Sequence, residues 1–439
     1  MKFYLSFALL ACATLLTLAQ STKREEFGSS LKRLKWDPKK EAAVEDKDKK
    51  DKKDKKAKKP EAKAADGDDV MRIETVLAVF DLLVVDKKGR AITGLKPEDF
   101  VIKEDGKLQE VGTFAMGDDV TRPRSIVLII DYSGSQRPYL HNSVAAAKIL
   151  VDKLGPQDRM AIVTDDVELL VNFTKDKAKL KSNLDGLEQG LNWSRRMGRS
   201  EQYSALFATL RELVVGEERP IVIFQTDGDE LMRLQPMAEN RPQFGRFAPK
   251  EFGLTDIITA AQKTRTTIYS VVSGLRFLGL PPEEQMARAR TEMQDRRAAM
   301  QSLMGGRINA PFRNQLEGDI PDWMLLRAAE TSQQRQSALA GVAKLTGGWP
   351  EFLETPEQAA AIYSRILSDI NRRYIIGYYP TNPNRDGSFR KVKVRVNDAD
   401  LIVRARDGYR AGSDTQAGNG DVNERKRPAL KRRQLAGAN

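Results

Sequence analysis

Between Ser125 and Val272 the sequence alternates short, continuous apolar runs with amphipathic stretches. The runs are SIVLIID, RMAIVTD, VELLVNF, PIVIFQTD and TTIYSVVS, and the stretches include NSVAAAKILVDKL, YSALFATLRELV and TDIITAAQKT. Apolar runs without polar alternation are typical of parallel strands that helices cover on both faces. The pattern therefore predicts a doubly wound α/β domain with a mostly parallel sheet, in which DDVELLVNFT adds a hairpin strand.

Stretches rich in strand-forming residues flank this domain, which we place at residues 124–372. The N-terminal segment, 71–117, contains ETVLAVFDLLVV and a hairpin that is predicted to turn at Asp105-Gly106. The C-terminal segment, 373–411, contains YIIGYYP, FRKVKVRV and LIVRARDGYR. Each segment alone would leave a hydrophobic face bare, so we expect the two to form one β-sandwich that the α/β domain interrupts.

Two inserts interrupt the α/β pattern. Residues 230–252 contain three prolines, which argue against regular structure. Residues 276–331 are charged and rich in methionine, and Met286, Met293 and Met300 recur at a seven-residue spacing on a predicted helix. That spacing favours packing of the methionines within their own domain. A further helix, an edge strand at WPEFL and a closing helix are expected after this insert.

The ends of the chain differ in composition from the rest. Residues 1–20 have the features of a signal peptide, because a lysine precedes an apolar run of about 16 residues that is short for a membrane span. The sequence LLAC also resembles a lipobox, which would place a lipid on Cys12. Residues 21–70 are predicted to be a charged disordered linker, and residues 412–439 a disordered basic tail. We therefore expect export to the periplasm or the cell surface, with no membrane span in the mature chain.

Composition excludes several classes of protein. The net charge is +12, but much of the excess lies in the linker and the tail, so we expect no nucleic-acid partner. The chain has one Cys and one His, which excludes an internal disulfide, Cys- or His-based zinc clusters and most His-dependent catalytic sites. The single histidine, His141, lies on a predicted helix and is interpreted as a surface residue.

Oxygen-bearing side chains follow two of the apolar runs. Asp131, Ser133 and Ser135 come directly after the first run, and Asp227 ends the run PIVIFQTD. In open α/β sheets, ligands bind at the carboxyl ends of strands near the point where strand order reverses, so these residues are expected to face each other. Carboxylates and hydroxyls without nearby Cys or His select a hard cation, Mg²⁺ or Mn²⁺. The neighbouring Asp229 and Glu230 are interpreted as loop acids.

The sequence DYSGS matches the Asp-x-Ser-x-Ser motif of the metal-ion-dependent adhesion site (MIDAS) in von Willebrand factor A domains, and the TDGD turn resembles that family too. In the family, a Thr just before a helix is a further ligand. Here SALFATL stands in its place, so the resemblance implies Ser204 in the Thr position, with Ser200 as the alternative. The ligand set that the resemblance implies is Asp131, Ser133, Ser135, Ser204 and Asp227.

The resemblance extends over residues 72–411. The segments VDKKGRAITGLKPEDFVIKEDGKLQEV, YIIGYYP and VRARDGYR look like the flanks of an exported bacterial group of von Willebrand factor A-related proteins, known especially from acidobacteria.

The resemblance implies a binding module rather than an enzyme. In that interpretation the metal keeps one position open for an Asp or Glu carboxylate of a partner protein. Two alternatives stay open: a structural or assembly component of the cell envelope whose metal stabilises the fold, and a metal-dependent phosphohydrolase. The second lacks a Gly-rich phosphate loop and a placed general base in the sequence.

Overall fold

The computed structural model describes residues 77–116, 123–189, 200–234, 250–304, 318–412 and 428–432. The predicted signal peptide, Cys12 and the predicted linker at 21–70 lie outside these ranges. Residues Phe277–Gln334 form a compact unit of their own, distinct from the unit that holds the remaining described residues. In the described part of the chain, no helix has both the length and the apolar composition of a membrane span.

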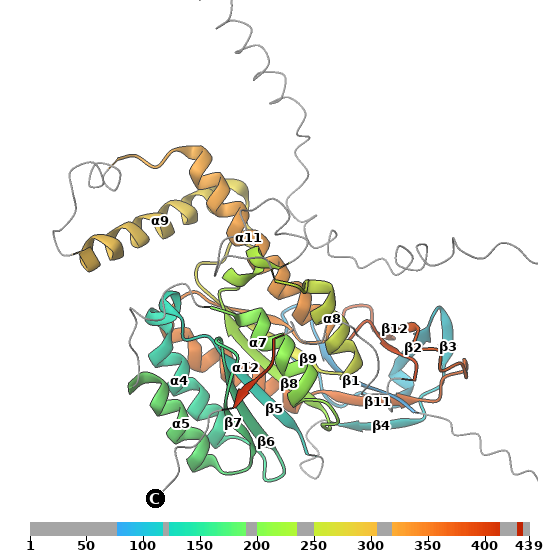
Figure 1. The fold of residues 1–439 in the computed structure, drawn as a ribbon. Coiled ribbons are helices and arrows are strands. Elements are labelled where there is room, and N and C mark those ends of the chain that lie inside the picture. Colours follow the sequence, from blue (N-terminus) through green and yellow to red (C-terminus); the bar gives the residue numbers. More distant parts are fainter. Residues whose placement is uncertain are drawn as a thin grey trace, which may run out of the picture. The chain divides into compact units, whose positions relative to one another are not determined.

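The α/β part is built on a mixed sheet (Figure 1). Among the described residues this sheet has seven strands, in the order β10 (Pro350–Leu353), β9 (Thr267–Ser273), β8 (Pro220–Thr226), β5 (Ser125–Ile130), β6 (Arg159–Thr164), β7 (Glu168–Thr174) and β15 (Lys431–Arg432). Only β6 and β7 pair antiparallel, and the other neighbours are parallel. The predicted doubly wound, mostly parallel sheet and its hairpin are confirmed.

Helices cover both faces of this sheet. One face packs against α4 (Arg137–Asp152), α5 (Lys177–Gln189) and α12 (Ala359–Asn371), and the other against α7 (Gln202–Ala208), α8 (Leu254–Lys263) and the last part of α11 (Asp322–Leu345). Alternate residues of β5 belong to the two hydrophobic clusters, Leu128 to the first and Val127 to the second. Burial on both faces explains why the strand is apolar at every position after Ser125. Short helical turns are η1 (Pro97–Asp99), η2 (Gly134–Gln136), η3 (Thr209–Leu213), η4 (Asp229–Arg233) and η6 (Pro356–Gln358).

The flanking segments form two antiparallel sheets that share one core. In the described residues the first sheet has the order β13 (Ile402–Arg404), β1 (Ala78–Val85), β11 (Tyr374–Tyr378) and β4 (Thr113–Met116), and the second β14 (Gly408–Arg410), β12 (Phe389–Val396), β2 (Phe100–Glu104) and β3 (Lys107–Gln109). The Phe100 and Tyr374 rings meet across the sheets with centroids 5.3 Å apart, and Phe80 and Tyr409 do so at 6.1 Å. Each sheet contains strands from both flanks, so the predicted sandwich is confirmed.

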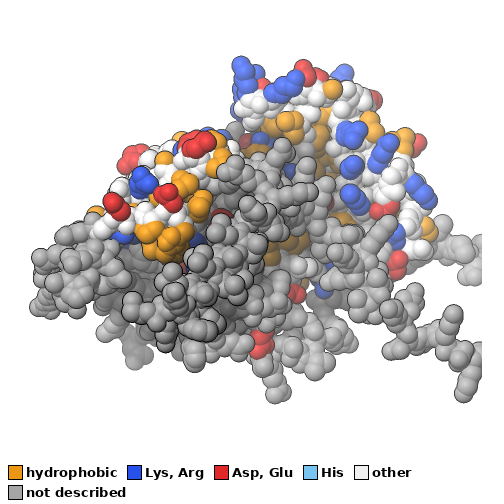
Figure 2. Space-filling model, turned by 90° about the horizontal axis from the view of Figure 1, so that it is seen from above, with side chains coloured by type: hydrophobic (Ala, Val, Ile, Leu, Met, Phe, Trp, Pro, Cys, Tyr) orange, Lys and Arg blue, Asp and Glu red, His pale blue; other side chains and the backbone are white. Residues whose placement is uncertain are grey.

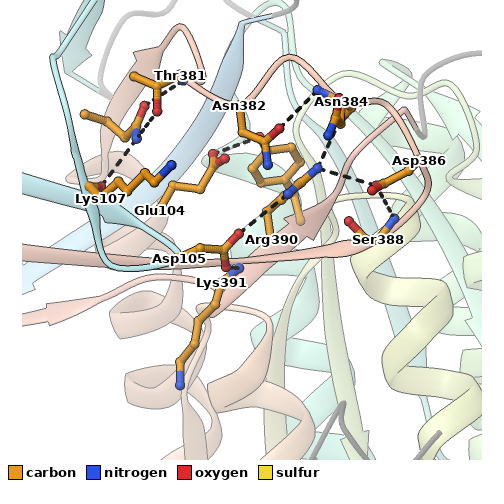
Figure 3. A network of polar contacts seen from close by, with 12 residues as sticks. Glu104, Asp105, Lys107, Thr381, Asn382, Asn384, Asp386, Ser388, Arg390 and Lys391 are labelled. Carbon is orange, nitrogen blue, oxygen red and sulfur yellow. Dashed lines mark hydrogen bonds and ion pairs between the residues drawn. The ribbon is translucent and has the colours of Figure 1, made fainter. Parts of the chain in front are cut away.

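A polar network ties two loops of the sandwich together (Figure 3). The buried guanidinium of Arg390 on β12 donates to the Asn384 carbonyl at 3.1 Å and lies 3.8 Å from the Asp105 carboxylate in the β2–β3 turn. Asp105 also accepts a hydrogen bond from the Lys391 N–H at 2.9 Å. The network connects the predicted turn at Asp105-Gly106 with the turn before β12 that contains Gly387, whose φ is +74°.

Buried arginines join the sandwich to the α/β part. Arg373, which is 2% exposed, donates to the Tyr269 hydroxyl of β9 at 3.0 Å, to the Asp81 carbonyl of β1 at 2.8 Å and to the Gly347 carbonyl at 2.9 Å. Arg219, just before β8, pairs with the Asp81 carboxylate at 3.0 Å. Three segments that are distant in sequence therefore meet at one guanidinium.

The separate unit is helical. It contains α9 (Pro282–Met304) and the first part of α11, and the predicted helix through Met286, Met293 and Met300 is α9. Trp323 and Leu326 on α11 are exposed. On the face of the molecule shown in Figure 2, hydrophobic side chains reach the surface between acidic and basic ones.

The C-terminal tail departs from expectation. We expected no regular structure from residue 412 to 439, but within the described residues 428–432, Lys431–Arg432 form β15. The strand pairs with the edge strand β7, so tertiary contact supplies what the local sequence does not.

Candidate metal centre

The oxygen-bearing residues lie where the strand order of the central sheet reverses. After β5 the chain builds β6 on one side and later returns to β8 on the other side of β5. The carboxyl ends of β5 and β8 are therefore neighbours, and Asp131 and Asp227 directly follow them. This is the place where α/β sheets bind ligands.

Asp131 is buried and held by its own loop and by β8. Its Oδ1 accepts a hydrogen bond from the Ser133 N–H at 3.0 Å, and its Oδ2 accepts one from the Thr226 hydroxyl at 3.0 Å. The Ser133 and Ser135 hydroxyls lie 3.2 Å apart, with Ser133 buried and Ser135 exposed. The sequence motif thus forms one polar cluster that reaches solvent at Ser135.

The turn after β8 requires a glycine. Gly228 has a φ of +71°, and a Cβ at this position would lie 3.0 Å from Leu339 Cδ1. Only glycine adopts this conformation without strain, and it directs the two flanking acids, Asp227 and Asp229, into the same turn. The Asp229 N–H donates to the Asp227 Oδ1 at 3.3 Å.

The side-chain amide of Gln202, at the start of α7, lies in the middle of the acidic residues. Its Nε2 is 3.0 Å from Asp131 Oδ2, 2.7 Å from Asp229 Oδ1, 3.4 Å from Asp227 Oδ1 and 2.8 Å from the Ser200 Oγ. An amide nitrogen has two hydrogens, so it cannot satisfy four oxygens. The cluster has more acceptors than this donor can serve.

The two candidate serines before and within α7 have different neighbours. Ser200 Oγ lies beside Gln202 Nε2, and therefore beside the acidic cluster. Ser204 is fully buried, and its hydroxyl donates to Glu230 Oε1 at 2.6 Å while its N–H donates to Glu230 Oε2 at 3.0 Å. The structure thus brings Ser200 together with Asp131 and directs Ser204 to Glu230 instead.

The turn between β6 and β7 supports both loops of the site. Asp165 Oδ1 accepts from the Tyr132 N–H at 3.1 Å, and the Asp165 carbonyl accepts from the Glu201 N–H at 2.9 Å. Asp166 Oδ2 accepts from the Tyr132 hydroxyl at 3.1 Å. Val167, next in the turn, has a φ of +65°, which is a strained conformation for a β-branched residue.

Electrostatics at the cluster favour a cation. Burial and the nearby Asp227 raise the pKa of Asp131 to about 7, and burial and Asp227 raise the pKa of Asp229 to about 6. Carboxylates crowded in a desolvated place repel each other, and a divalent cation relieves that repulsion. No group of three or more Asp, Glu, His or Cys among the described residues has an arrangement that could hold a metal. A cation here would therefore need hydroxyl ligands in addition to carboxylates, and the serines supply them.

Sequence reasoning missed two members of the cluster. Asp229 was interpreted as a loop acid, although its place two residues after Asp227 in the TDGD turn was a usable signal. Gln202 carried no signal, because a glutamine in the first turn of a helix is ordinary and only tertiary contact places its amide among the acids. The interpretation of His141 agrees with its side chain, which is 82% exposed and pairs with Glu188 at 3.2 Å.

Residues 126–230 match the family model described as von Willebrand factor type A domain. The match begins in β5 and ends in η4, so it contains the DYSGS loop, the Ser200 loop and the TDGD turn. No curated protein matches the chain.

The solved structures that match parts of this chain come from several organisms. The von Willebrand factor type A protein from Catenulispora acidiphila is 11% identical over 74% of this chain and 73% of its own, with a TM-score of 0.32. The vWF domain of the type V pili tip protein Mfa5 from Porphyromonas gingivalis is 14% identical over 57% of this chain and 95% of its own, with a TM-score of 0.34. Proximal thread matrix protein 1 from the mussel byssus, in a structure with a zinc-occupied MIDAS motif, is 13% identical over 57% of this chain, with a TM-score of 0.32. The chain spans about half the length of that mussel protein, 48%.

Proposed function

Because the chain carries a von Willebrand factor type A domain, we propose that it is a metal-dependent protein-binding module and not an enzyme. The observation that supports this most is the arrangement around Asp131, where two more carboxylates and several hydroxyls gather at the switch point of the sheet. Mg²⁺ and Mn²⁺ are the cations that prefer such oxygen ligands.

We assign the metal to Asp131, Ser133, Ser135 and Asp227, with Ser200 in place of Ser204 as the loop ligand. Ser200 is chosen because its hydroxyl lies with the cluster, whereas the Ser204 hydroxyl is already bonded to the buried Glu230. Asp229 would add negative charge beside the ion.

A bound cation would supply an electrophilic centre with a free position for an Asp or Glu carboxylate of a partner protein. Residues of this chain would position the cation and the incoming partner carboxylate. Thr226 and Ser133 hold the Asp131 carboxylate in place through its two oxygens. Ser135, which is exposed, marks the side from which a partner approaches. This role fits the export that the N-terminal sequence predicts.

Titration with Mn²⁺ tests the metal site. The purified protein should bind Mn²⁺ at one site, and Asp131→Ala should weaken binding at least about tenfold. Asp185→Ala is the matched control, because it removes a carboxylate from the half-exposed side of α5. Equal affinity of Asp131→Ala and the wild type would contradict the assignment.

Partner capture separates a binding module from a structural metal. Capture from envelope extract should succeed in Mg²⁺ and fail in EDTA, and Asp131→Ala should fail in both. If EDTA lowers the melting temperature while partner capture persists, the metal stabilises the fold and the structural alternative holds.

A further inference from the structure

The edge of the central sheet at β7 is occupied by the chain's own C-terminal segment. β15 pairs parallel to β7, with Lys431 opposite Glu168 and Arg432 opposite Leu169. The Lys431 N–H donates to the Val167 carbonyl at 2.8 Å. An uncovered edge strand presents backbone donors and acceptors that can pair with any extended segment.

Side chains add specificity to this backbone pairing. Leu430 packs against the hydrophobic cluster beneath α7 and α8, and its N–H donates to Glu212 Oε2 at 3.3 Å. Lys431 Nζ donates to the Asp166 carbonyl at 2.8 Å. Leu430 therefore packs on an apolar surface, and the neighbouring backbone and the Lys431 side chain bond to acceptors at its border. Backbone pairing combined with a side-chain anchor is the pattern of recognition by strand addition.

We propose that the β7 edge is a docking site for an extended basic segment with one leucine anchor, and that residues 428–432 of the same chain are its occupant. The sequence of this segment and its neighbours is RKRPALKRRQ. A tether of 15 residues, 413–427, separates it from the sandwich. A tethered segment acts at an effective concentration of about 1 mM, so it outcompetes the same sequence supplied as a free peptide.

None of the contacts of the docked segment is with a proposed metal ligand, although the turn at Asp166 and Val167 that it contacts also supports a loop of the metal centre. The segment's contacts are with β7, with η3 and with the backbone carbonyls of Asp166 and Val167. Measurements in EDTA therefore test docking without any effect of a bound cation, so the result can be separated from that of the metal titration.

A labelled peptide, ERKRPALKRRQLA, tests the proposal by fluorescence anisotropy in EDTA. Full-length Leu430→Ser should release its own segment and bind the peptide at least about tenfold more tightly than the wild type does. Ala429→Ser is the matched control, because Ala429 is exposed in the docked segment, and it should bind like the wild type. Equal binding by the wild type and Leu430→Ser would overturn the proposal.

Two further measurements separate docking from charge attraction and from misfolding. The peptide with Leu430→Ser keeps the charge of the unmodified peptide. If it binds as tightly as the unmodified peptide, binding depends on charge attraction alone and the proposed docking site is wrong. In the unmodified full-length protein, hydrogen exchange at the Lys431 amide should be protected through its bond to Val167. Exchange at the rate of an unstructured chain would also overturn it.

Discussion

Ser200 lies in the loop before α7 and Ser204 lies within α7, and their hydroxyls have different partners. Ser200 lies with Gln202 at the acidic cluster, whereas Ser204 donates twice to Glu230. Glu230 is 1% exposed, so it depends on these donors and on Lys250, whose Nζ lies 3.4 Å away. Under the proposed assignment, the same residue type would serve metal binding at Ser200 and fold stability at Ser204.

Substitution separates the two roles. Ser200→Ala should weaken Mn²⁺ binding about tenfold and leave the free energy of unfolding nearly unchanged. Ser204→Ala should keep Mn²⁺ affinity and lower the free energy of unfolding by about 1–3 kcal/mol, because the buried Glu230 loses a donor. Calorimetric titration and urea unfolding measure the two quantities. The reverse result, with Mn²⁺ affinity lost only in Ser204→Ala, would return the ligand to Ser204.

Asp369 on α12 gives the stability a pH dependence. Burial raises its pKa to about 6, although Arg404 and Arg373 oppose the shift. Its ordinary pKa is 3.8, so between these values the folded carboxyl keeps a proton that the unfolded one has lost. The contribution of Asp369 to the free energy of unfolding therefore falls as pH rises from about 4 to about 6, by at most about 3 kcal/mol, and this contribution is level above that window.

Asp369→Asn should remove this component. The difference in unfolding free energy between the variant and the wild type should change between pH 4 and pH 6 in favour of the variant, and stay constant from pH 7 upward. Urea unfolding across the range measures it. A difference that is the same at every pH would refute the assignment to Asp369.

At the scale of elements, the strands of the central sheet were predictable and the tail strand was not. β5 is apolar from Ile126 to Ile130 because both of its faces are covered, and a continuous apolar run in the sequence indicates that condition. The hairpin turn was predictable because Asp105 and Gly106 tolerate positive φ, which they adopt at +47° and +89°. β15 has two basic residues and no strand pattern, so it exists only through its partner β7. Likewise Gln202 reaches the acidic cluster by tertiary contact, which no local pattern encodes.

The two sheets of the sandwich should lose protection together. Val392 on β12 is buried in the shared core, whereas its neighbour Lys393 points to solvent. Val392→Ala should cost about 2 kcal/mol and speed hydrogen exchange in β1 as well as in β2, because both strands line that core. Lys393→Ala, the matched control, should change stability by less than about 0.5 kcal/mol. Faster exchange confined to β2 and β12 would contradict a common core.

For the whole molecule, Arg373 couples the sandwich to the α/β part. Its guanidinium bonds acceptors on β1, on β9 and at Gly347, and nothing smaller reaches all three. Unfolding of either part would leave these acceptors without their buried donor. The two parts should therefore unfold in one cooperative transition.

Arg373→Met should replace the single cooperative unfolding transition with two separate transitions. The loss of a donor from three acceptors costs at least about 3 kcal/mol, and the part with fewer remaining contacts should melt first in differential scanning calorimetry. Arg372→Met, at the exposed neighbouring position, should melt like the wild type. A single unchanged transition in Arg373→Met would show that the coupling lies elsewhere.

The insertion of the α/β part between β4 and β11 has a mechanical consequence. These two strands are hydrogen-bonded neighbours, with Met116 opposite Tyr374, so the chain leaves the sandwich and returns to it at adjacent points. A pulling force applied between the start of β1 and the end of β14 is borne by the strands of the sandwich. The α/β part lies outside that line of force. A partner bound at Asp131 would exert force on the α/β part only through its own contacts there. Tension between the start of β1 and the end of β14 would leave the geometry of the acidic cluster unchanged.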